Sequence, residues 1–183
     1  MNVHGFLIMA ICVATIAASS DWRKGKIPNV LTHGVLIAAP IIHVGRVVQV
    51  EGWTQDCWLV LLGSILGALV CGLVPMLLFV KGAAGAGDVK LLAAIGALLG
   101  PRIGIEMAFF SFVAAGLVGP ARLAYEGRLF SSIKTAALVA VRPSSKNNDN
   151  AKTLVADLSA RFPLGPSVLV GTVVTSWLHW RSV

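Results

Sequence analysis

Six apolar segments divide the chain. Residues 1–20, 27–45, 57–80 and 162–180 contain no Asp, Glu, Lys or Arg, residues 91–100 form a shorter segment of the same kind, and residues 103–121 are interrupted by Glu106 alone. A helix that crosses a bilayer needs about 20 mostly apolar residues, with a range of about 17–25. The pattern therefore predicts an all-α, polytopic membrane protein with about six transmembrane helices.

The composition supports this prediction. The 183 residues are 56% hydrophobic and 13% charged, with a mean hydropathy of +0.82. Soluble domains are usually about 45–50% apolar and about 25% charged. The composition therefore excludes an ordinary soluble enzyme, and its apolar content excludes a disordered chain. We interpret residues 1–183 as one integral membrane domain.

The basic residues predict the orientation of the chain. The net charge is +7, but the cations lie in short clusters between the apolar segments and form no nucleic-acid-binding motif, so nucleic acid is not an expected partner. With both termini outside, 12 of the 15 Lys and Arg residues fall on the cytoplasmic side, and Arg46, Arg102 and Arg181 fall outside. This is the bias that cytoplasmic loops show. Residues 1–6 contain no Lys or Arg, and Arg23, Lys24 and Lys26 follow the first apolar segment instead, which favours a retained helix over a cleaved signal peptide.

The longest predicted cytoplasmic segment covers residues 122–161. Its first half has apolar residues four apart with charges between them, as in an interfacial amphipathic helix. Two interpretations stay open for this segment: a simple connector and a surface on which a substrate docks.

Two of the eight acidic residues stand out by position. Asp21 follows the first apolar segment, and Asp88 precedes the short fourth one, so the predicted topology brings both to the cytoplasmic ends of helices. Two neighbouring carboxyl groups share a proton, so that one activates a water as general base while the other polarises a carbonyl. Glu106 is instead expected near the outer end of the fifth helix, where it reaches the surface or pairs with Arg102.

The shortness of the fourth segment places Asp88 below the membrane surface. Residues 88–100 form about 20 Å of helix, whereas the hydrocarbon core is about 30 Å thick. An ionisable group at that depth is a candidate functional site. The alternative is that the aspartates cap helices, which suits Asp88 at a helix N-terminus but not Asp21 at a C-terminus.

The segment before Asp88 is rich in glycine. Gly85-Ala86-Gly87 permits a substrate strand to approach Asp88 closely, and it is equally a packing motif or a turn. Three cysteines without a CxxC pair, and scattered histidines, indicate neither a disulfide framework nor a metal site.

These residues resemble two motifs of the type IV prepilin peptidases, polytopic aspartic proteases named for a GxGD sequence. The first is Asp21-Trp-Arg-Lys-Gly-Lys-Ile-Pro-Asn-Val-Leu-Thr32, and the second is Gly85-Ala-Gly-Asp-Val-Lys-Leu-Leu-Ala-Ala-Ile-Gly-Ala97. A weaker third similarity is Phe162-Pro-Leu-Gly-Pro-Ser167, before the last helix. Together the motifs cover most of the chain in order.

The resemblance implies an aspartic endopeptidase that removes the leader peptide of prepilins or pseudopilins at the cytoplasmic face of the inner membrane. It implies that Asp21 and Asp88 are catalytic and that Gly85, Gly87, Lys90, Pro28 and Asn29 bind substrate, with no metal and no cofactor. The chain lacks the methyltransferase insert of longer members, and so resembles the peptidase-only form that serves Flp-type pili. Archaeal preflagellin peptidases are non-methylating too, so the resemblance leaves the exact system open. The expected partners are the prepilin, the lipid bilayer and the pilus-assembly or secretion machinery.

Two rival functions belong to other classes. In a proton-coupled transporter or an assembly scaffold, Asp21 and Asp88 would be proton-relay sites. Another aspartic membrane peptidase, such as one acting on lipoprotein precursors, would differ at Ile27-Pro28-Asn29 and around Asp88.

Overall fold

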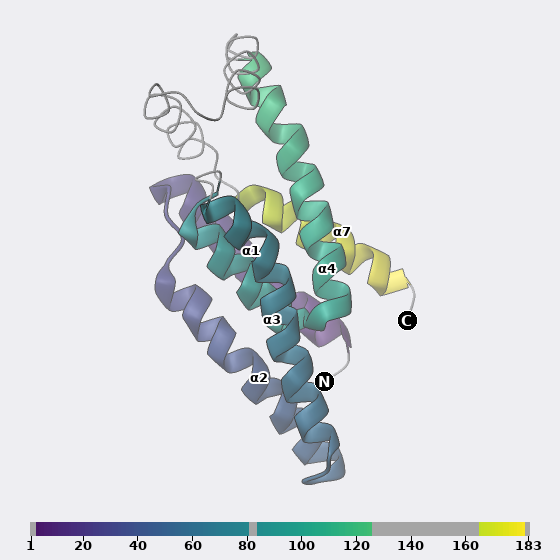
Figure 1. Ribbon diagram of the computed structural model, residues 1–183. Helices are drawn as coiled ribbons and strands as arrows, with labels where there is room; N and C mark the ends of the chain where they lie inside the picture. The colour runs from purple at the N-terminus through teal and green to yellow at the C-terminus, as the bar shows by residue number, and fades with distance from the viewer. Residues whose placement is uncertain (1–2, 81–83, 126–164, 182–183) are drawn as a thin grey trace.

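The computed structural model describes residues 3–80, 84–125 and 165–181. These residues form five helical elements and no strand, which confirms the predicted all-α class for the described part of the chain (Figure 1). The elements are α1 (Val3–Lys24), α2 (Asn29–Glu51), α3 (Asp56–Val80), α4 (Ala86–Tyr125) and α7 (Gly165–Arg181).

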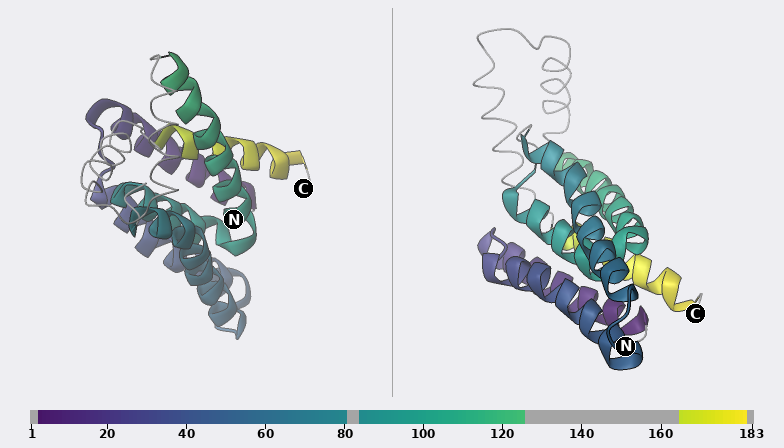
Figure 2. Two further views of the ribbon diagram at one scale, coloured as in Figure 1. Left: turned by 45° about the horizontal axis from the view of Figure 1, so that its top comes forward. Right: turned by 60° about the horizontal axis from the view of Figure 1, so that its bottom comes forward.

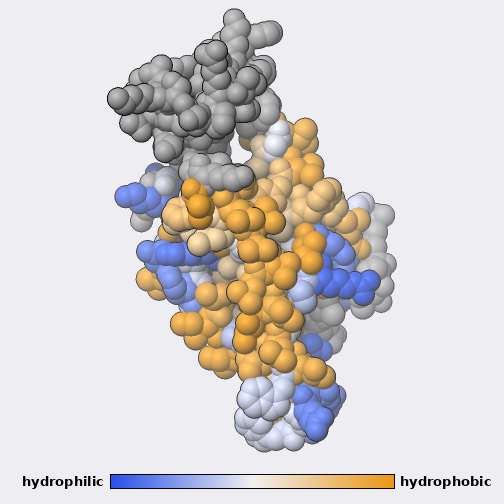
Figure 3. Space-filling model, viewed as in Figure 1, coloured by the Kyte–Doolittle hydropathy of each residue, from blue (hydrophilic) through white to orange (hydrophobic). Residues whose placement is uncertain are grey.

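Four of these helices are long and apolar enough to cross a membrane: His4–Arg23, Asn29–Glu51, Asp56–Val80 and Ala86–Val118. The face over α3 is a nearly continuous apolar surface, with polar residues at its lower end and along its two edges (Figure 3). Large side chains on this helix, such as Leu59, Leu69 and Leu77, are exposed. In water such a surface would be unstable, so the molecule is a membrane protein.

The count of four differs from the predicted six for two reasons. The predicted segments 91–100 and 103–121 both lie in α4, and the described part of the last segment, α7, has only 17 residues. The predicted connector at 122–161 lies outside the described residues, apart from its first four positions, which continue α4.

The element α4 is a helical hairpin that reverses at Gly100. The φ of this residue is +76° and its ψ is 175°, which is not a helical conformation. A Cβ added to Gly104 would lie 3.3 Å from the Cα of Gly96. Residues eight apart along a straight helix are separated by about 12 Å, so the chain folds back on itself here. The break that the sequence predicts between the fourth and fifth segments is therefore present.

Side chains from two other helices satisfy the carbonyl groups that this break leaves without helical partners. Pro101 has no N–H to donate to the carbonyl of Ala97, and that oxygen accepts a hydrogen bond from the Ser64 hydroxyl at 2.8 Å. The carbonyl of Leu98 contacts Nε2 of His43 at 2.9 Å. Buried backbone groups are nearly always paired, and α3 and α2 supply the partners here.

The first arm of α4 is the centre of the bundle. The element contacts α1, α2, α3 and α7, and its contact with α3 is the most extensive (Figure 2). Leu91, Ile95 and Leu98 of the first arm are fully buried, as are Leu7 and Ala10 of α1. Because protein surrounds this arm, it does not need the length of a lipid-facing span.

At the end of the bundle opposite Asp88, α7 contacts α1 and the second arm of α4. The His4 ring lies 4.5 Å from the Trp180 ring, and the Glu106 carboxylate lies 3.5 Å from Nε2 of His179. The interpretation of Glu106 as a partly exposed structural residue agrees with this contact. The suggested partner Arg102 was wrong, because α7 brings His179 to that carboxylate instead.

Candidate active site

Asp21 lies in the last turn of α1, which extends four residues beyond the predicted apolar segment. Gly25 ends the helix with a φ of +61°, and its N–H donates to the carbonyl of Asp21 at 2.8 Å. The Ser20 hydroxyl then donates to the carbonyl of Lys26 at 3.1 Å. Pro28 is the N-cap residue of α2, and its carbonyl accepts the N–H of Leu31 at 3.2 Å. The first motif is thus a tight, internally bonded turn between α1 and α2.

The Asp21 side chain is buried, with 8% of its surface exposed. Its Oδ2 atom accepts a hydrogen bond from the backbone N–H of Gly165 at 3.0 Å. Gly165 is the first residue of α7 and lies 144 positions further along the chain. A carboxylate is favoured beside the unpaired N–H groups of a helix N-terminus, which compensates for the unfavourable position of Asp21 near a helix C-terminus.

Asp88 is the third residue of α4 and is 9% exposed. Its Oδ2 atom accepts the N–H of Gly85 at 3.1 Å, and its own N–H donates to the carbonyl of Gly85 at 3.1 Å. The Asp88 carboxyl thus supplies the N3 half of a helix capping box, and Gly85 at the N-cap has no side chain to reciprocate. Asp88 therefore caps the start of α4 from its third residue and not from the N-cap position, and the hydrogen bond holds its carboxyl in one orientation.

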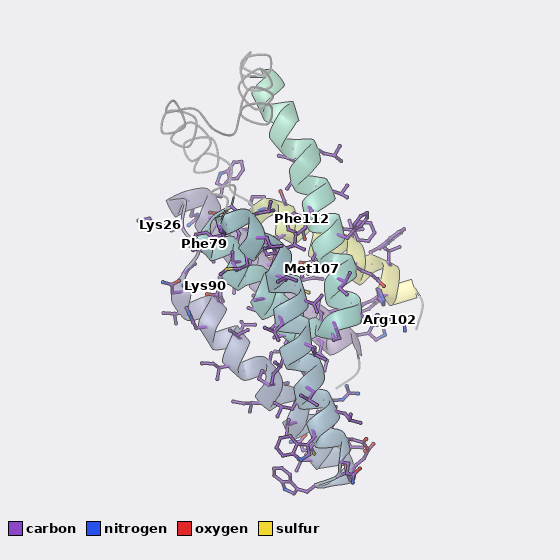
Figure 4. The ribbon with its side chains drawn as sticks, in the orientation of Figure 1. Lys26, Phe79, Lys90, Arg102, Met107 and Phe112 are labelled. Carbon is purple, nitrogen blue, oxygen red and sulfur yellow. The ribbon has the colours of Figure 1, made fainter. Side chains whose placement is uncertain are left out.

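The two motifs are in direct contact. The Lys90 ammonium donates to Oδ1 of Asn29 at 3.1 Å, which joins α4 to the first turn of α2. A Cβ added to Gly87 would lie 3.4 Å from Cβ of Ile27, so the glycine lets this side chain pack against the start of α4. Figure 4 shows Lys26 and Lys90 on the same side of the molecule, with Arg102 on the opposite side. These two contacts bring the motifs that carry Asp21 and Asp88 to the same end of the bundle.

The residues expected to bind substrate occupy this same end of the bundle. Gly85 and Asn29 are exposed, Gly87 and Lys90 are partly buried, and Pro28 is exposed at the start of α2. Each of them also has a structural role: Gly85 holds Asp88, Gly87 packs on Ile27, Lys90 and Asn29 form a hydrogen bond, and Pro28 is the N-cap of α2. Their contact with substrate stays a prediction.

The described residues contain no group of three or more His, Cys, Asp or Glu side chains that could hold a metal ion. What they bring together is a pair of buried carboxyl groups, each held through one oxygen by a glycine N–H. Such a pair can share one proton and act as a general acid and a general base. The arrangement suits hydrolysis of an amide bond by an activated water.

The sequence interpretation did not assign a site role to Gly165 or Ile27. Both lie inside motifs that it had noted, Gly165 in Phe162–Ser167 and Ile27 after the basic stretch. The signal for Gly165 was a glycine between two prolines before an apolar helix. The role of this glycine depends on the contact between α7 and Asp21, which no local sequence pattern predicts.

Comparison with known proteins agrees with the arrangement of this site. A model of the type IV leader peptidase family matches residues 8–119, which include both aspartates and both of the long motifs. No individual curated protein and no solved structure gives a significant match. Because the family match spans more than half of the 183 residues, the chain belongs to the type IV leader peptidase family.

Proposed function

We propose that this protein is an intramembrane aspartic endopeptidase that removes the leader peptide of Flp-like prepilins or pseudopilins, with Asp21 and Asp88 as its catalytic pair. The family supports a leader peptidase role and a prepilin substrate. One observation carries the assignment of the pair. Two carboxyl groups from distant parts of the sequence are almost wholly buried, and the contacts Ile27–Gly87 and Asn29–Lys90 join the two motifs that carry them.

Asp21 and Asp88 belong to different helices, α1 and α4, so only the packing of the bundle pairs them. In the proposed reaction one carboxylate takes a proton from a water, which attacks the scissile carbonyl carbon. The other, protonated carboxyl donates a hydrogen bond to the carbonyl oxygen, and the proton later passes to the leaving amine. The burial of both carboxyl groups strengthens their electrostatic interactions with the reacting atoms, because a water-poor site has a low dielectric constant.

The proposal includes six membrane spans with both termini outside and the catalytic pair at the cytoplasmic face of the inner membrane. Three observations support this topology. The reversal at Gly100 divides α4 into two arms, which count as two spans. α7 is then the sixth span, and successive spans cross the membrane in alternate directions. With this count, 12 of the 15 Lys and Arg residues fall on the same side of the membrane as Asp21 and Asp88. The first arm, residues 86–99, is about 21 Å long, which keeps Asp88 inside the inner boundary of a core about 30 Å thick.

The short connection between α1 and α2 supports the peptidase-only, Flp-like assignment. α1 ends at Lys24 and α2 begins at Asn29, so the connection holds no inserted domain, and the whole chain has no CxxC pair. We therefore expect leader removal without N-methylation of the new terminus.

The experiment is co-expression with candidate Flp-like prepilins, followed by measurement of leader loss from the shift in prepilin mass. We expect cleavage by the natural chain and none by Asp21→Asn or Asp88→Asn, because each variant removes a group that must exchange a proton. Glu106→Gln is the matched control, since it also removes a carboxylate within a helix but lies at the opposite end. All three variants should accumulate in the membrane. Normal processing by either aspartate variant would remove that residue from the catalytic pair.

A further inference from the structure

The last helix, α7, lies beyond the residues that the family model matches, yet it reaches the candidate active site. The match ends at residue 119, and α7 begins at Gly165. Among the described residues, the hydrogen bond to the Asp21 side chain comes from the backbone N–H of Gly165, at 3.0 Å. The partner of one proposed catalytic carboxyl therefore belongs to a part of the chain with no role in the reaction so far.

Only a residue without a side chain fits at this position. A Cβ on residue 165 would lie 2.8 Å from Oδ2 of Asp21, 3.0 Å from its Cβ and 3.2 Å from Cα of Ala18. Carbon atoms in proteins prefer separations of about 3.5–4.0 Å. A larger residue would therefore push α7 away from α1 or turn the Asp21 carboxyl out of its present orientation.

A second close contact holds α7 in register. A Cβ on Gly171 would collide with the hydroxyl and the N–H of Ser111 and with the carbonyl of Met107, all on the second arm of α4. The backbones of α7 and α4 therefore touch about two turns after Gly165, as small residues permit between membrane helices. This contact prevents α7 from sliding, so the Gly165 N–H has a fixed place relative to α1.

We propose that Gly165 is a positioning residue for leader-peptide cleavage: its N–H holds one oxygen of Asp21, and its lack of a side chain lets α7 approach closely enough to do so. This inference rests on the proposed function. Asp88 is held in the same way by the N–H of Gly85, at 3.1 Å. Each carboxyl group thus has Oδ2 bound to a glycine N–H, and we expect its Oδ1 to act on a water, a substrate carbonyl or the other carboxyl group.

The kinetic test compares Gly165→Ala with Gly63→Ala in the full chain in lipid vesicles, with an Flp-like prepilin as substrate. Gly63 is the control because a Cβ there meets nothing within 4 Å. We expect Gly165→Ala to lower kcat by at least about tenfold, since misplacement of a reacting group by about 1 Å costs up to about 100-fold. Its KM should stay within about twofold, and Gly63→Ala should match the natural chain. An unchanged kcat, or a raised KM with kcat preserved, would overturn the proposal.

A second measurement uses no Gly165 variant and so does not depend on that variant folding. In the chain labelled with 15N-glycine, Asp21→Ala should shift the Gly165 amide resonance and speed its exchange with solvent at least about tenfold, because the amide loses its acceptor. The Gly85 amide should stay unchanged. Asp88→Ala should have the reverse effect on the two amides. If Asp21→Ala changes neither the Gly165 amide resonance nor its exchange rate, the proposal is refuted.

The two hypotheses fail in different ways. If Asp21→Asn still cleaves prepilin, the catalytic assignment fails even when the amide resonances respond as expected. If Asp21→Asn is inactive but Gly165→Ala cleaves at the natural rate, the catalytic assignment stands and the positioning role of Gly165 is wrong.

Discussion

Substitution of Gly67 by alanine tests the packing that places the first arm of α4. Gly67 lies on α3 where that helix crosses the hairpin. A Cβ there would collide with the carbonyl oxygen of Gly96 and lie 2.9 Å and 3.0 Å from the carbonyl carbon and Cα of Gly100. All three are backbone atoms, which cannot rotate away as a side chain can. The two helices must therefore separate to admit the methyl group.

The magnitude follows from a matched substitution on the same helix. Gly63 is one turn earlier on α3, and a Cβ there meets nothing within 4 Å. Gly63→Ala should therefore stabilise the protein by up to about 1 kcal/mol, the usual gain in a helix. Gly67→Ala has the same gain but suffers overpacking of about 1–3 kcal/mol. We therefore expect Gly67→Ala to be the less stable of the two by about 1–3 kcal/mol.

The assay is reversible unfolding of both variants by SDS in mixed micelles, monitored by circular dichroism, with prepilin processing measured in parallel. Gly67→Ala should unfold at lower SDS and process prepilin more slowly, because the displaced arm carries Asp88. Equal unfolding free energies for the two variants would refute the close approach of α3 and α4. Reduced stability with full processing would show that Asp88 tolerates movement of its helix.

Three further predictions concern the site and the membrane. Lys90→Met and Asn29→Ala should lower kcat/KM by similar factors, and the double variant should lower it little further, because both remove the same 3.1 Å hydrogen bond; additive losses would indicate separate roles. Serine reagents, thiol reagents and chelators should leave cleavage intact, and so should replacement of all three cysteines, because the proposed pair needs none of these groups; inhibition by a chelator that added zinc reverses would contradict this mechanism. In that cysteine-free chain, a cysteine at Gly25 should label from the cytoplasm, one at Gly52 from outside, and one at Val89 slowly and only with small permeant reagents; equal rates at Val89 and Gly25 would place Asp88 at the surface.

Much of the fold follows from local features of the sequence. Apolar segments of span length predict α1, α2 and α3, although α1 and α2 continue past the predicted ends at residues 20 and 45 to Lys24 and Glu51. The segments are recognisable because the bilayer requires about 20 apolar residues wherever the chain crosses it. The helix break at Gly100-Pro101 is equally local, since proline lacks an N–H and glycine adopts a positive φ readily. Each of the two long motifs is an unbroken run of residues, so the candidate aspartates could be identified without the structure.

Contacts between distant segments were decided by the tertiary structure. The sequence suggested Arg102 as the partner of Glu106 because the two are four positions apart, but packing of α7 on α4 brings His179 there. The bond between Gly165 and Asp21 joins residues 144 positions apart, and the bond between Lys90 and Asn29 joins residues 61 apart. Helix periodicity shows which residues share a face, whereas these pairs depend on where whole helices cross. Those crossings are set by how closely backbones approach at Gly67, Gly96 and Gly171, and each approach depends on both helices at once.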